Sequence, residues 1–83
     1  MLIQNASDAH SFVTVWGTQP PASAARQMTY AIEGLKKARA IIGEARTDEF
    51  IDLSQAIGVL LVARLRFRAA AGEIRLVASE PIR

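Results

Sequence analysis

Hydrophobic residues recur at helical spacing in the middle of the chain. The apolar positions on one side of this segment are Met28, Ile32, Leu35 and Ile42. Ser23 precedes them as a favourable N-cap, and Gly43 follows them where a helix C-cap prefers glycine. The pattern therefore predicts an amphipathic helix over residues 23–43.

A second helix is predicted to begin at Thr47, where Asp48 and Glu49 suit the positive end of the helix dipole. Its main apolar stripe consists of Phe50, Leu53, Ile57, Leu60 and Leu61. Two ends are open. The helix runs over 47–71 and stops before Gly72, or it covers 47–57 and breaks at Gly58, which leaves 59–68 to form a strand.

Segments rich in β-branched and aromatic residues predict the remaining elements. Residues 10–16 (HSFVTVW) are expected to form a short strand that ends before the two prolines at 20 and 21. Residues 74–79 are expected to form a strand, which pairs with 59–68 as a hairpin if the second helix is short. The expected fold class is α+β: a helical hairpin with short strands, in a single domain over 1–83.

The second helix predicts self-association if it is long. Ile51, Val59 and Val62 then lie opposite its main stripe, where one neighbouring helix cannot cover them. A chain of 83 residues without cysteine has a small core and no disulfides to support it, so we expect a homodimer. Aromatic residues off the main core stripe are common binding anchors. The predicted protein interface is Trp16, Tyr30, Ile51, Val59 and Val62.

Charge is segregated along the chain, and this raises an alternative function. Residues 44–63 carry a net charge of −3, whereas residues 64–83 carry +3. The basic residues of the second segment that could bind nucleic acid are Arg64, Arg66, Arg68 and Arg75. A strand would align the first three on one face, whereas a helix would direct Arg66 away from Arg64 and Arg68.

The predicted order strand–helix–helix, with the residues TDEFI opening the second helix, resembles ribbon-helix-helix DNA-binding proteins. That resemblance implies a dimeric ribbon in the major groove. The strand at 10–16 contains no Lys or Arg, and the first helix is longer than the family's, so membership is not assigned.

Catalytic chemistry finds little support in the sequence. His10 is the only imidazole, and it is interpreted as a partly exposed histidine beside Asp8, an aspartate at a turn. Glu44, Asp48 and Asp52 recur every four residues and could hold Mg²⁺, but acids are ordinary at a helix start. We expect no catalytic site, metal, cofactor, small-molecule substrate or membrane span.

The chain is therefore expected to be a non-enzymatic protein–protein interaction module, such as a small adaptor, inhibitor or assembly component, acting as a homo-oligomer. The first residues, Met1 to Gln4, lack the features of a signal peptide, which favours a cytoplasmic location. A preference for Arg over Lys and an abundance of Ala are typical of GC-rich coding sequences and indicate a bacterial or phage origin.

Overall fold

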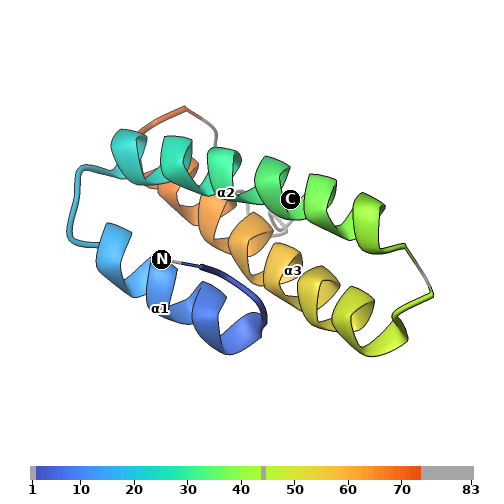
Figure 1. Ribbon diagram of the computed structural model, residues 1–83. Helices are drawn as coiled ribbons and strands as arrows, with labels where there is room; N and C mark the ends of the chain where they lie inside the picture. Colours follow the sequence, from blue (N-terminus) through green and yellow to red (C-terminus); the bar gives the residue numbers. More distant parts are fainter. Residues whose placement is uncertain (1, 44, 74–83) are drawn as a thin grey trace, which may run out of the picture.

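The computed structural model describes residues 2–43 and 45–73, and these residues form three helices: α1 (Ala6–Trp16), α2 (Pro21–Ile42) and α3 (Thr47–Ala70). α3 packs against both of the other helices, whereas α1 and α2 contact each other much less (Figure 1). No strand occurs within the described residues. The predicted α+β fold class is therefore wrong, and the described fold is all-helical.

The predicted strand at 10–16 lies inside α1. The Asn5 side chain caps this helix by accepting a hydrogen bond from the Asp8 backbone N–H (2.9 Å), and the Asp8 carboxylate accepts one from the Gln4 N–H (2.9 Å). The first bond satisfies a backbone donor that a helix start leaves unpaired, and the second ties the residue before the cap to the first turn. The resemblance to ribbon-helix-helix proteins fails with the strand, because that family requires a ribbon here.

Tertiary packing explains why β-branched residues form a helix in α1. Ala9 is fully buried, and Phe12, Val13 and Trp16 pack against the core around it. These positions are three, four and seven residues from Ala9, which places them on one side of a helix. Burial of this side outweighs the modest helix propensities of Val13 and its neighbours, since propensity is a weak preference.

The helix predicted over 23–43 is present as α2, which begins two residues before the predicted Ser23 cap. Pro21 occupies the first turn, where proline's missing N–H is no loss and its fixed φ suits a helix. Gly43 follows the helix with φ of 65°, and its N–H donates to the Arg39 carbonyl (2.8 Å). A positive φ favours glycine, which explains why α2 ends here.

α3 continues through Gly58, so both the short helix 47–57 and the strand 59–68 are wrong. Ile57, Leu60 and Ala63 are buried on successive turns, and this burial holds the helix together beyond the glycine. The helix ends at Ala70, one residue before the predicted end at 71, and Gly72 follows with φ of 80°. The strand predicted at 74–79 lies outside the described residues.

The core lies where α3 meets the other two helices and the segment that precedes α1. Within the described residues every buried side chain is apolar. Met28, Ile32 and Leu60 are its largest fully buried members, and Ile3 joins them from the N-terminal segment. No helix in this part of the chain is both long and apolar enough to cross a membrane.

Candidate protein-binding surfaces

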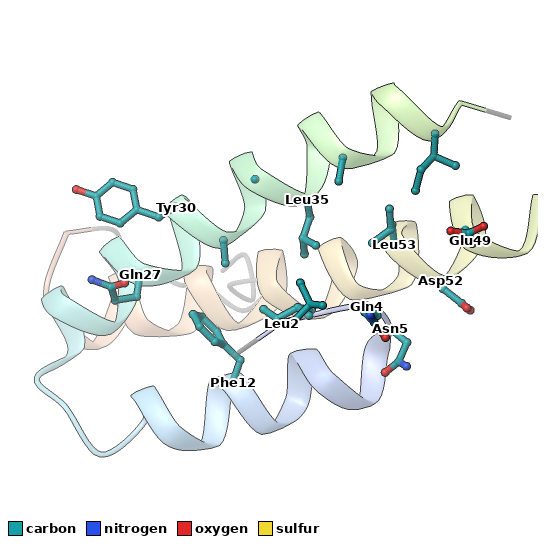
Figure 2. Close-up of a pocket in the computed structure, with 15 residues that line it drawn as sticks. Leu2, Gln4, Asn5, Phe12, Gln27, Tyr30, Leu35, Glu49, Asp52 and Leu53 are labelled. Carbon is teal, nitrogen blue, oxygen red and sulfur yellow. The ribbon is translucent and has the colours of Figure 1, made fainter. Parts of the chain in front are cut away.

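A groove of about 740 Å³ opens between α1 and α2, and its floor includes Leu53 of α3 (Figure 2). It exists because α1 and α2 each pack on α3 but scarcely touch each other. Its apolar lining comes from all three helices and the segment before α1: Leu2, Ile3, Phe12, Ala31, Leu35, Ala38, Ile42 and Leu53. Gly34 also lines it, and a Cβ atom there would meet nothing within 4 Å.

The two ends of the groove differ in chemistry. Gln27 and Tyr30 lie at one end, and Glu49 and Asp52 lie at the other (Figure 2). Both charged lining residues are therefore acidic. Glu49 forms an exposed ion pair with Arg46 (3.2 Å), whereas Asp52 has no hydrogen bond or ion pair with another described residue. A ligand with a positive charge at this end would be favoured by the carboxylates.

Leu2 is the most exposed apolar side chain of the groove wall. It is 74% exposed, whereas its neighbour Ile3 is buried in the core. Ile3 thus anchors the N-terminal segment and holds Leu2 at the groove beside Phe12 and Leu35 (Figure 2). An apolar partner that covered Leu2 would gain free energy in proportion to the area removed from water.

A second apolar surface lies on α3, on the side directed away from the core. Its residues follow one another at spacings of four and three, within an arc of about 80° on a helix with 100° per residue. We call it the outer face of α3: Ile51, Gln55, Gly58, Val62, Leu65 and Ala69. Ile51 is 46% exposed, Val62 54% and Leu65 46%. This alternation is the seam pattern of a coiled coil, yet no described helix covers it.

The predicted interface residues do not form one surface. Ile51 and Val62 share the outer face of α3, and Tyr30, 59% exposed, lies at the groove. Val59 is half-buried against the core. Trp16 is half-buried at the end of α1, with its ring 6.3 Å from that of Phe12. Trp16 and Val59 therefore contribute mainly to packing within the chain.

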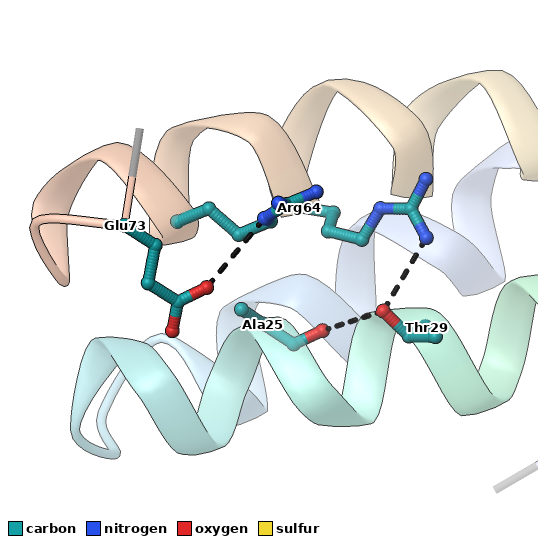
Figure 3. Close-up of polar contacts among 5 residues, drawn as sticks. Ala25, Thr29, Arg64 and Glu73 are labelled. Atoms are coloured by element: carbon teal, nitrogen blue, oxygen red, sulfur yellow. Dashed lines mark hydrogen bonds and ion pairs between the residues drawn. The ribbon is translucent and has the colours of Figure 1, made fainter. Parts of the chain in front are cut away.

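The arginines predicted to bind nucleic acid do not share one face of α3, and Arg64 is held against α2 (Figure 3). Arg64 donates to the Thr29 hydroxyl of α2 (3.3 Å), which itself donates to the Ala25 carbonyl (3.2 Å). Arg68 pairs with Glu73 (3.5 Å). Arg66 is exposed and has no partner among the described residues. Arg75 lies outside the described residues, and the shared face that a strand would provide is absent.

The groove and most of the outer face were missed by sequence reasoning. Gly58 and Leu65 belong to the heptad spacing that starts at Ile51, so that spacing could have found them. Leu61, predicted in the core stripe, is 38% exposed instead. The groove has no comparable signal, because Leu2, Gly34 and Leu53 come from segments far apart in the sequence.

Neither a metal-binding cluster nor a similarity to a known protein identifies further functional residues among those described. Across residues 2–43 and 45–73, no three metal-ligating side chains lie close enough together to hold an ion. No protein-family model, curated protein or solved structure matches this chain. The groove between α1 and α2 and the outer face of α3 are the candidate functional surfaces of the described residues.

Proposed function

We propose that this protein is a non-enzymatic interaction module that binds an amphipathic helix of another protein in the groove between α1 and α2. The observation that carries the proposal is the groove itself: about 740 Å³, lined by apolar side chains from three helices, with acidic residues at one end. Helix-in-groove recognition needs an apolar cleft and little other chemistry. An adaptor, inhibitor or assembly component would use such a site.

The helix expected in the groove has a definite character. Its apolar face would cover Leu2, Phe12 and Leu35, and a Lys or Arg near one end would lie beside Glu49 and Asp52. The small residues Ala31, Gly34 and Ala38 on α2 leave room for a close approach. An anionic ligand is disfavoured, since the charged lining residues are both carboxylates.

A matched pair of substitutions at Gly34 tests the proposal. A displayed library of peptides with helical apolar spacing and varied polar positions is selected on the wild-type protein. Gly34→Phe fills the groove, and we expect it to raise the dissociation constants of the selected peptides by about tenfold or more. Gly34→Ala adds one methyl group in open space and should retain binding. Circular dichroism confirms that both variants remain folded.

Failure to select any peptide from this library, or equal binding by Gly34→Phe, would contradict the proposal. The nucleic-acid alternative is tested on the same samples with random duplex DNA at low and high salt. Binding that falls steeply with salt and is lost in Arg66→Gln would favour that alternative. The predicted cytoplasmic location stays a prediction.

A further inference from the structure

We infer that the outer face of α3 joins two copies of this chain, with their α3 helices antiparallel and related by a two-fold axis near residues 59–61. The proposal concerns a surface other than the groove, which it meets at Asp52, and it does not depend on what the groove binds. Two observations carry it: the heptad spacing of exposed apolar residues from Ile51 to Ala69, and the distribution of charge along the helix.

Charge selects the antiparallel orientation. The first turns of α3 carry Asp48, Glu49 and Asp52, and its last turns carry Arg64, Arg66 and Arg68. A parallel pair would bring like charges and like ends of the helix dipoles together, which is unfavourable. An antiparallel pair brings the acidic start of each helix to the basic end of the other.

The register follows from two exposed side chains that have no partner among the described residues. Asp52 and Arg66 flank the outer face on the same side and lie seven residues before and after Val59. Neither has a hydrogen bond or ion pair with another described residue, whereas Arg64 and Arg68 are engaged within the chain. A two-fold axis near Val59 places Asp52 beside the partner's Arg66, and the same pair forms again on the other side.

The same register matches large side chains with small ones across the axis. The seam of each helix has two alternating kinds of position, because its residues are spaced by four and then by three. In an antiparallel coiled coil, a residue at one kind of position lies opposite a partner residue at the other kind. Val62 then faces the partner's Gly58, and Ile51 faces the partner's Ala69. Because Gly58 has open space where a Cβ would lie, it leaves a hollow for a valine side chain. Gln55 faces the partner's Leu65 and is the one polar residue in the seam.

Sedimentation equilibrium with matched variants tests the association. We expect a wild-type dimer and, for Val62→Glu, a dissociation constant raised about tenfold or more, because a charge would enter the apolar seam. Ile41→Glu is the control, since Ile41 is 85% exposed on α2 and belongs to neither surface. A monomeric wild type at high protein concentration, or equal weakening by both variants, would overturn the proposal.

Charge reversal tests the register. Asp52→Arg or Arg66→Asp alone replaces two attractions with two repulsions, and we expect the dissociation constant to rise roughly threefold to tenfold. The double variant restores both attractions and should recover wild-type association. A parallel dimer would show no such loss and recovery. Gly34→Phe, which fills the groove, should leave dimerisation unchanged, so failure of this proposal and failure of the groove proposal are distinguishable.

Cross-linking tests the orientation directly, because the chain contains no cysteine that would complicate labelling. Leu61→Cys, near the axis, should be joined to its own copy by a short bismaleimide. Ile51→Cys should not be, since two such positions would be separated by roughly 25 Å along antiparallel helices with a 1.5 Å rise per residue. Efficient cross-linking of Ile51→Cys to itself would show a parallel pair and overturn the inference.

Discussion

The inner face of α3 buries Leu53, Ile57 and Leu60 against α1 and α2, whereas its outer face leaves Ile51, Val62 and Leu65 about half exposed. Both faces are apolar and both follow helical spacing. They differ only in whether the chain supplies a neighbour. Side-chain chemistry on the inner face therefore determines whether the monomer folds, and side-chain chemistry on the outer face determines what the folded monomer contacts.

Leu60→Ala makes the sharpest contrast between these faces. Leu60 is fully buried, so the change removes its packing and leaves a cavity at the junction of the three helices. We expect a loss of about 3 kcal/mol in the free energy of unfolding. Urea denaturation at low protein concentration measures it. A loss below about 1 kcal/mol would mean that α3 is not held by its inner face.

The cap of α1 provides a second test of how much the inner face of α3 contributes to stability, because α1 packs against that face. Asn5→Ala removes the side-chain oxygen that accepts the Asp8 N–H at 2.9 Å. The expected loss is about 1 kcal/mol of unfolding free energy. Asn5→Asp and Asn5→Ser keep an acceptor at the N-cap, so both variants should lose much less. Equal losses in all three would show that the cap does not stabilise α1.

The sequence predicts two of the three described helices and gets the first one wrong, and particular residues show why. The inner stripe of α3 and the helix at 21–42 are visible as hydrophobic periodicity, because each depends on neighbours three or four residues away. The error at 10–16 arose because Val13 and Val15 favour strands locally, while Asn5 with Asp8 and the spacing of Ala9, Phe12 and Trp16 favour a helix. Here packing and capping outweighed propensity.

The remaining errors concern contacts that local sequence does not encode. Gly58 suggested a helix end, but the burial of Leu60 and Ala63 beyond it offsets the cost of one glycine. The outer face could be foreseen in part, since Ile51 and Val62 lie opposite the core stripe. The groove depends on how α1 sits relative to α2, and that arrangement is decided only when both helices pack on α3.

Substitutions at two helical glycines allow the stability of the fold to be measured separately from dimerisation. Gly34→Ala and Gly58→Ala should each raise the unfolding free energy by roughly 0.5–1 kcal/mol, because glycine is a poor helix former and both sites have open space for a Cβ. Thermal or urea denaturation measures this. Only Gly58→Ala should weaken dimerisation, since only Gly58 lies on the outer face of α3. Destabilisation by either variant would contradict the open space at that site.

The smallest expected effect is the most informative about the outer face. Val62→Ser removes apolar surface that is 54% exposed, so the unfolding free energy of the monomer should change by no more than about 0.5 kcal/mol. The measurement is urea denaturation at a concentration well below the dissociation constant, with Leu60→Ala as the buried counterpart on the same helix. At high concentration the wild type should gain stability from association, whereas Val62→Ser should gain less. A large loss at low concentration would mean that the same chain covers Val62, and the outer face would then belong to the fold rather than to an interface.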